Sequence, residues 1–342
     1  MRRLSSHRPD RTAGTAPPPA VPRRLDGGRR DLLALGLLAL AAAGAVALYL
    51  TIDVSGNVAY IMGRRLGSLA ALVLVATAIA VSTVVFQTVT ANRILTPSIM
   101  GLDSLYVLIQ TAAIHLGGIS GLAALGATPR FLLEVGILLL AATLLYSRML
   151  RGGADLTRLL LAGVVLGMLF RGLSTFLQRI LSPDAFTVLQ DRLFASFSRA
   201  SGELLLPAAI LLCLGLAAVV LERRRLDVLA LGPDLARGLG VDPDRVRLRM
   251  LAAVALMVAV STALVGPVTF FGLLVAHLAY RAIRHQRHAL VLPAAALAAI
   301  IALVGGQAIV EHALPIEASL SIIIELVGGI AFLVIVLRRS RA

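Results

Sequence analysis

Two charged side chains, Arg171 and Glu325, lie inside long apolar runs of the sequence. We estimate the depth of each residue from its distance along the predicted span, measured from the same side of the membrane and with the rise per residue of an α-helix. Both residues lie roughly 12 to 13 Å deep. An unpaired charge at that depth costs ~3 kcal/mol or more. The two side chains are therefore expected to pair, within one chain or between two, or to line a water-filled cavity. The alternatives to a functional role are a pair that only stabilises the fold, or two side chains that reach water separately.

Other polar side chains in or beside the apolar runs suggest further contacts. Gln87 and Gln178 are predicted either to line a pathway or to form hydrogen bonds between helices, and the second role is favoured. Arg64 and Arg65 come just before the second apolar run. They either receive acidic residues of a docking protein or anchor the span at the lipid head groups.

Motifs for catalysis, nucleotides and metals are missing from the sequence. It has no HExxH, GxSxG or paired-aspartate motif, which disfavours an intramembrane enzyme. It has no lysine, so it lacks a GxxxxGK[ST] nucleotide-binding loop. His277, His285 and His288 have no acidic or cysteine partner nearby in the sequence and are predicted to be inner-loop residues. No catalytic residue, metal site or cofactor is predicted.

The longest charged segment away from the termini runs from residue 222 to 249 and contains seven arginines. Its apolar residues are spaced for two short amphipathic helices, with Gly232-Pro233 as the bend between them. The arginines predict a cytoplasmic position. A folded hairpin at that position suits contact with a soluble partner, and an ordinary positively charged loop is the alternative.

The composition indicates an all-α membrane protein. Of 342 residues, 58% are hydrophobic and the mean hydropathy is +0.92. About ten apolar runs are long enough to be membrane-spanning helices. The formal net charge of +14 is better explained by topology than by nucleic-acid binding, because the charges lie between the apolar runs and aromatic residues make up only 4%.

Arginine positions predict the orientation. With the amino terminus inside, 25 of the 32 basic residues lie in cytoplasmic segments and 6 lie outside. Both termini are therefore expected in the cytoplasm. Residues 1–30 are predicted to be a disordered basic tail, and residues 31–342 the membrane domain.

Two local patterns predict details of the helix arrangement. Gly101, and the pair Gly163 and Gly167, are small residues that let helices approach closely. Residues 182–203 place Phe186 and other apolar side chains at helical spacing, which predicts an outer amphipathic helix in the membrane interface.

Four segments resemble the FecCD family, the permease subunits of bacterial ABC importers for iron-siderophore complexes and vitamin B12. FQTVTANRILTPSIMG resembles the family's Gln, Asn-Pro-Leu-Ala and proline-to-glycine pattern, with Arg93-Ile94 in place of Pro-Leu. LAGVVLG is similar to the fifth span, and LGPDLARGLGV resembles the ATPase-docking motif. GPVTFFGLLVAHLAY resembles Gly-Pro-Ile-x-Phe-x-Gly-Leu followed by Pro-His-x-x-Arg, with Ala276 and Tyr280 replacing the proline and arginine.

The resemblance implies a type II ABC importer permease in a bacterial plasma membrane. It implies two ABC ATPase subunits, a second permease that is like or unlike this one, and an extracellular siderophore-binding protein. The ATPase-coupling contacts would fall on the segment 231–241, with these residues as contact positions: Leu231, Gly232, Ala236, Arg237, Leu239, Gly240 and Val241.

The resemblance also bears on the cargo. The fifth and tenth spans border the pathway in this family, so Arg171 and Glu325 are expected to face it, with Arg171 attracting an anionic ferric siderophore. The substituted motifs look most like permeases for catecholate and mixed catecholate-citrate siderophores. An ion-coupled secondary transporter and a permease for vitamin B12 or haem are the alternatives.

Overall fold

The structure, a computed structural model, describes residues 25–53, 57–124, 126–150, 156–193, 197, 202–313 and 322–330. In chain order its helices are α1 (Leu25–Thr51), α2 (Val58–Val89), the short 3-10 helix η1 (Pro97–Met100), α3 (Leu102–Ala124), α4 (Ala127–Leu150), α5 (Leu156–Gln178), α6 (Pro183–Leu193), α7 (Gly202–Leu229), α8 (Pro233–Gly238), α9 (Pro243–Val265), α10 (Phe271–Ala282) and α11 (His288–Ala313). Residues 322–330 are also helical, and no strand occurs within the described ranges. The all-α prediction is confirmed.

Seven helices in the described part of the chain are long and apolar enough to cross a membrane, by length and composition: α1, α2, α4, α5, α7, α9 and α11. Three others lie where the remaining apolar runs were predicted. Of these, α3 has non-helical backbone at Gly118, α10 has 12 residues, and only residues 322–330 of the last apolar run are described. A multi-pass helical membrane fold is confirmed, while the count of ten spans stays a prediction.

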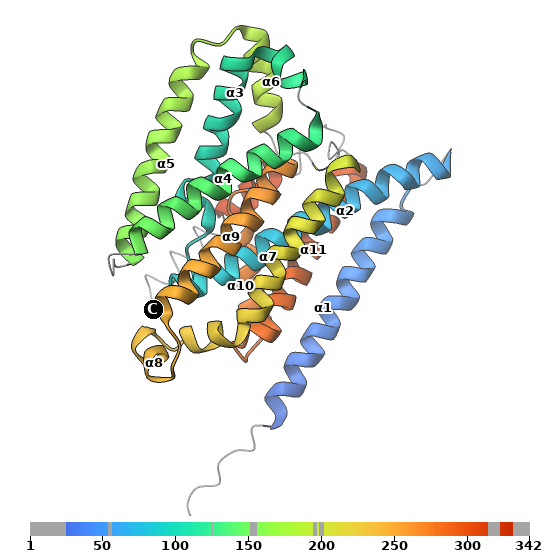
Figure 1. Cartoon of the computed structure of the whole chain (residues 1–342). Coiled ribbons are helices and arrows are strands. Elements are labelled where there is room, and N and C mark those ends of the chain that lie inside the picture. Colours follow the sequence, from blue (N-terminus) through green and yellow to red (C-terminus); the bar gives the residue numbers. More distant parts are fainter. Residues whose placement is uncertain are drawn as a thin grey trace, which may run out of the picture.

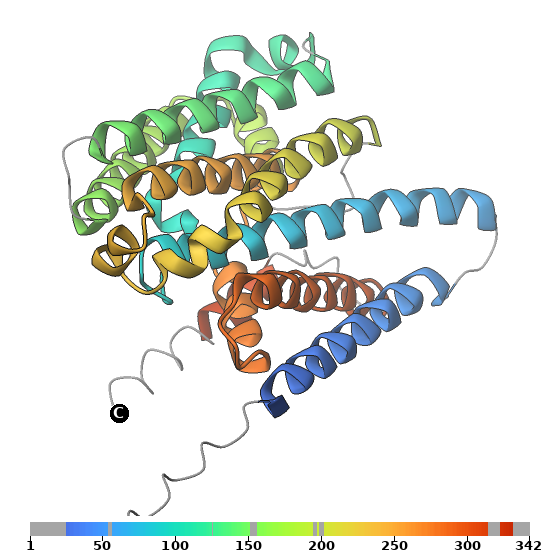
Figure 2. The same ribbon diagram turned by 60° about the horizontal axis from the view of Figure 1, so that its bottom comes forward.

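The core of the bundle forms around α2 and α9. In their most apolar windows, 67% of α2 and 72% of α9 is buried, against 11% of α1. Ala71, Ala76 and Ala80 on α2 are fully buried, and α2 packs against both α9 and α11. Small side chains let helix backbones approach closely, which allows several neighbours around one helix. The first helix, α1, lies at the edge of the bundle beside α11 (Figures 1 and 2).

Glycines bring η1 and α5 into direct backbone contact. Gly101 has a φ of +81°, and a Cβ added to it would lie 2.8 Å from the Cα of Gly167. A Cβ added to Gly163 would lie 3.0 Å from the Cα of Met100. The predicted close approach at Gly101, and the helix-packing role of Gly163 and Gly167, are confirmed.

The segment after α5 contains the predicted amphipathic helix. In α6, Ala185 and Leu189 are buried while Phe186 is 39% exposed. Within the described residues α6 runs from Pro183 to Leu193, and most of the remainder of the predicted segment lies outside them.

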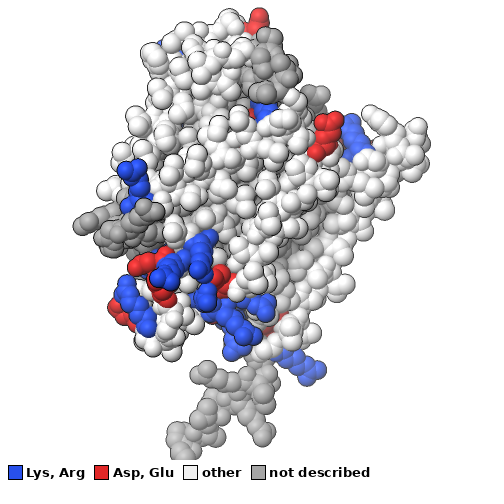
Figure 3. All heavy atoms as spheres, viewed as in Figure 1, with Lys and Arg blue, Asp and Glu red and all other residues white. Residues whose placement is uncertain are grey.

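Charged side chains gather at one end of the molecule. Figure 3 shows Arg, Asp and Glu concentrated around α8, with a broad uncharged surface above them. Of the predicted tail, residues 1–24 lie outside the described residues, and residues 25–30 form the first turns of α1.

Candidate functional site

The charged segment folds into a hairpin between α7 and α9. The backbone turns at Gly232, whose φ is +107°, and Pro233 begins α8. A second turn at Gly240, with a φ of +78°, is closed by a 2.9 Å hydrogen bond from Val241 N to Ala236 O. Residues 222–229 continue α7 instead of forming a separate short helix, so the first of the two predicted short helices is wrong. The second is α8, and the bend lies at Gly232-Pro233 as predicted.

Three leucines cover the outside of this hairpin. Leu231, Leu235 and Leu239 are 58%, 61% and 62% exposed. Leu231 and Leu239 belong to the predicted coupling residues, and their exposure leaves both side chains open to a partner. Of the predicted coupling residues, Arg237 and Gly240 are also exposed, and Gly232 and Val241 are half-buried. Ala236 is fully buried and supports the turn from within, so it does not present a contact surface.

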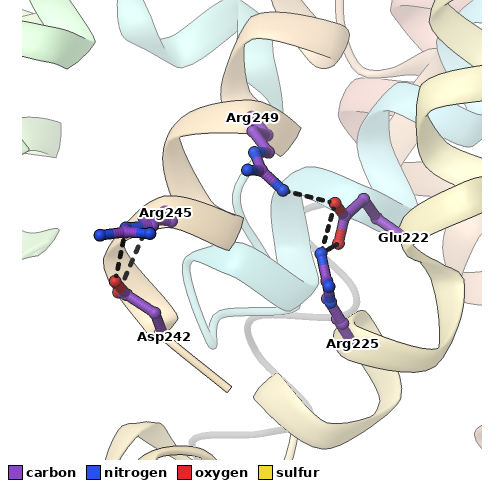
Figure 4. A network of polar contacts seen from close by, with 5 residues as sticks. All are labelled: Glu222, Arg225, Asp242, Arg245 and Arg249. Atoms are coloured by element: carbon purple, nitrogen blue, oxygen red, sulfur yellow. Dashed lines mark hydrogen bonds and ion pairs between the residues drawn. The ribbon is translucent and has the colours of Figure 1, made fainter. Parts of the chain in front are cut away.

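An ion-pair network joins α7 to α9 at the base of the hairpin (Figure 4). Glu222 on α7 accepts hydrogen bonds from Arg225 at 2.9 Å and from Arg249 on α9 at 2.8 Å. At the start of α9, the side chain of Asp242 accepts from the backbone N–H groups of Asp244 and Arg245, a helix-capping arrangement. Charge-assisted bonds to both flanking helices hold the exposed leucines on a defined support.

The family-model comparison decides the class of the protein. The FecCD transport family model matches residues 32–338. The chain belongs to the FecCD transport family. It is a permease subunit of an ABC importer and a multi-pass inner-membrane protein; ATP hydrolysis is the task of separate ATPase subunits.

Individual relatives of this permease agree with the family match. It is 42% identical over 314 residues to the petrobactin import system permease protein YclO of Bacillus subtilis (strain 168), covering 92% of this chain and 99% of that protein. It is 35% identical to the petrobactin import system permease protein FatC of Bacillus anthracis, covering 82% and 79% of the two chains. A metal-chelate type ABC transporter solved in an inward-facing conformation shares the fold, with a TM-score of 0.77, 24% identity, and coverage of 90% of this chain and 99% of that one.

Two positions at which the permease departs from the family motifs lie in contact. The guanidinium of Arg93 lies 4.6 Å from the ring centroid of Tyr280, a cation–π distance. Arg93 also donates to the side-chain oxygen of Gln286 at 3.1 Å. The family motif has an arginine at the position of Tyr280 on α10. In this chain that position is a tyrosine, and Arg93 of the α2–η1 loop contacts its ring.

The intramembrane charges occupy one region without a direct pair. Arg171 on α5 is exposed, and Glu325 accepts a 2.9 Å hydrogen bond from Thr269. No ion pair joins Arg171 to Glu325, although the structure describes both. Asp103, at the start of α3, lies within electrostatic range of both residues. Sequence reasoning missed Asp103 and Thr269.

The two predicted glutamines are engaged inside the fold. Gln87 is 2% exposed, and its amide donates to the backbone oxygen of Arg93 at 2.9 Å. Gln178 on α5 donates to Thr111 on α3 at 3.3 Å. Gln178 therefore forms the predicted hydrogen bond between helices, whereas Gln87 binds the backbone of the α2–η1 loop.

The two arginines in the first turns of α2 have different roles. Arg65 binds the end of α1 through the backbone oxygens of Tyr49, Leu50 and Ile52, at 3.1, 3.3 and 2.6 Å. Arg64 is exposed beside it. Because Arg65 caps a helix, only Arg64 has a guanidinium turned to solvent.

The histidines have partners that are distant in the sequence. His277 lies within α10, so its assignment to an inner loop is wrong. His285 lies in the α10–α11 loop, and its Nδ1 is 2.7 Å from Asp31 on α1. His288, the first residue of α11, has its Nδ1 2.6 Å from Asp227 on α7. These contacts connect residues 254 and 61 positions apart, which leaves no local sequence signal.

Proposed function

We propose that this permease carries a ferric siderophore of the petrobactin type into the cytoplasm. The coarser assignment, an iron-chelate ABC importer permease, follows from the family and its relatives. The finer one is supported by two petrobactin permeases at 42% and 35% identity, the first aligned over 99% of its length. The sequence motifs predict a catecholate or mixed catecholate-citrate siderophore, whose anionic ferric complex suits a pathway with a positive charge.

The hairpin around α8 is the surface on which an ATPase subunit binds. The observation that carries this assignment is the set of leucines at 231, 235 and 239, each more than half exposed at the charged end of the molecule. That end is the arginine-rich one and is placed in the cytoplasm, with both termini, by the positive-inside rule. An exposed leucine there faces water until a partner covers it, whereas leucines on the spans face lipid. Each leucine contributes ~1.5 to 3 kcal/mol when fully buried.

Arg171 and Glu325 form the charged part of the pathway. Arg171 is exposed on the α5 surface, which a second permease, like or unlike this one, covers in the assembled transporter. Pairing of Arg171 with Glu325 across the two permeases stays part of this proposal. Arg64 is the remaining candidate to meet acidic residues of the extracellular binding protein. Gln87 and Gln178 are given structural roles because their amides already donate within the fold.

Uptake in cells tests the cargo. A strain that lacks this permease, but keeps its partner subunits, is given ferric petrobactin labelled with radioactive iron. The native permease restores uptake, and Arg171→Lys retains most of it. Arg171→Leu reduces uptake because the positive charge is lost. Normal uptake by Arg171→Leu contradicts the role of Arg171, and no uptake by the native chain contradicts the petrobactin assignment.

A further inference from the structure

A buried histidine links three helices at the end of the molecule that carries α8. His288 is 4% exposed. Its backbone N–H donates to Asp227 Oδ1 on α7 at 2.8 Å, and its Nδ1 lies 2.6 Å from the same oxygen. On the other side of the ring, Nε2 lies 2.8 Å from Thr88 Oγ1 on α2. One side chain at the start of α11 thus connects the last turn of α7 to the last turn of α2.

The link survives in either charge state of the ring. Asp227 Oδ1 is an acceptor, so Nδ1 carries a proton in both states. In the neutral ring, Nε2 accepts the hydroxyl proton of Thr88. In the charged ring, Nε2 donates to Thr88 Oγ1, and the hydroxyl donates to the backbone oxygen of Val84, 3.0 Å away.

The position of this link matters because α7 leads directly into the hairpin. Asp227 is in the final turn of α7, and the chain bends at Gly232. A cavity of about 220 Å³ lies between the bend and the end of α2, and Thr88, His288, Gly232 and Pro233 are among its lining residues. A Cβ added to Gly232 would meet no atom within 4 Å. The bend is therefore not packed directly against α2.

We propose that His288 is a positioning residue that transmits displacement of the hairpin to the inner end of α2. This inference rests on the proposed function, in which the hairpin moves with the ATPase subunits. Apolar contacts between α7 and α2 have no preferred direction, so they permit sliding. A hydrogen-bonded chain of fixed geometry makes the two ends move together. The α2 end is followed by the loop that carries Arg93, so its movement alters the inner mouth of the bundle.

A second aspartate–histidine pair in the same loop provides a matched control. Asp31 on α1 is 1% exposed and accepts from the backbone N–H groups of Arg284 and His285, each at 3.0 Å. Its Oδ2 also lies 2.7 Å from His285 Nδ1. The chemistry is the same, but the pair fastens α1, which is neither the hairpin nor α2. A substitution of Asp31 therefore shows the effect of losing a buried aspartate–histidine pair while the link through His288 stays intact.

The test measures ATP hydrolysed per ferric petrobactin transported by the complete transporter in proteoliposomes. Thr88→Val removes the hydroxyl with little change of shape, and Thr88→Ser keeps it. We expect Thr88→Val to raise the ratio on the order of tenfold, with ATP hydrolysis within about twofold of the native rate. Thr88→Ser restores the native ratio. Asp227→Ala removes the oxygen that accepts from the backbone N–H and Nδ1 of His288, so it raises the ratio as well and tests the link if Thr88→Val fails to assemble. Asp31→Ala, the matched control, leaves the ratio unchanged.

Two substitutions of His288 each keep one of its two side-chain contacts and remove the other. An asparagine places its amide nitrogen near the Nδ1 position, and a glutamine places it near the Nε2 position. His288→Asn keeps the contact to Asp227, His288→Gln keeps the contact to Thr88, and both raise the ratio because each breaks the chain at one end. Native ratios in Thr88→Val and Asp227→Ala overturn the inference, as does a lowered unfolding temperature with an unchanged ratio. Uptake by the native permease without its ATPase overturns the proposed function instead.

Discussion

Arg249 on α9 donates a 2.8 Å hydrogen bond to Glu222 on α7, residues 27 positions apart on the two sides of the hairpin. Glu222 is largely covered, with 13% of its side chain exposed, while Arg249 is 56% exposed. The carboxylate also holds Arg225, so one acidic group fixes both arginines (Figure 4). This contact closes the base of the loop that carries the exposed leucines.

Glu222→Gln is expected to loosen the hairpin without unfolding the bundle. The arginines are partly screened by water, so the substitution lowers the free energy of local unfolding of the hairpin by ~1 kcal/mol, which makes its opening about fivefold more frequent. The hydrogen-exchange rates of the amides between Gly232 and Val241 measure this opening. Asp234→Asn is the control, because Asp234 is 94% exposed and its pair with Arg237 contributes little. Equal exchange in both variants contradicts the bracing role.

Leu235→Ala is expected to weaken ATPase binding. If the leucine is fully covered by the partner, the loss is about 2 kcal/mol, or a roughly thirtyfold higher Kd. Titration of the ATPase subunit onto the permease in nanodiscs measures it. Leu214→Ala on the membrane-spanning part of α7, where the leucine is 58% exposed, should leave the Kd unchanged. An unaltered Kd in Leu235→Ala removes the hairpin from the interface.

Gly101→Ala is expected to destabilise the membrane domain. The added Cβ would lie 2.8 Å from Gly167 Cα, and the φ of +81° is unfavourable for alanine. The combined cost is about 3 kcal/mol, enough to lower the thermal unfolding midpoint by about 4 °C. Gly172→Ala on α5 meets no atom within 4 Å and should not lower it. Similar midpoints for the two variants contradict the close crossing of η1 and α5.

The contact between Arg93 and Tyr280 is expected to tolerate exchange better than single replacement. Tyr280→Arg places two guanidinium groups together and loses a cation–π contact that contributes roughly 1 kcal/mol. The double variant Arg93→Tyr with Tyr280→Arg recovers the pair, and Tyr280→Phe, which keeps a ring, is nearly neutral. Thermal midpoints of the native protein, Arg93→Tyr, Tyr280→Arg and the double variant form a double-mutant cycle. Additive losses mean that the two side chains do not interact.

Much of the fold was predictable because its signals are local. Apolar runs gave the positions of the long helices, and Gly101, Gly163 and Gly167 marked a close crossing that the structure contains. The hairpin was predicted less well. Amphipathic spacing showed that Leu231, Leu235 and Leu239 share a side, but spacing alone does not tell whether that side is covered by the same chain or by another protein.

The polar contacts of the site were not predictable for a different reason. Thr88 and His288 are 200 positions apart, and the fold alone brings them together. The sequence makes Arg65 a candidate for binding another protein, but in the structure its guanidinium donates hydrogen bonds to carbonyl oxygens at the end of α1. Ala236 belongs to the predicted coupling motif, yet its burial shows that a motif contains supporting residues as well as contact residues.

The central claim is that this chain provides a gated path while another subunit supplies the energy at the α8 hairpin. Its most direct test is accumulation of ferric petrobactin in proteoliposomes that contain the permease, its partner permease and the binding protein, with and without the ATPase subunits. Accumulation against a gradient should require both the ATPase and ATP, and should be lost when Leu231, Leu235 and Leu239 are replaced by aspartate. Uphill accumulation by the permease without any ATPase would contradict the claim.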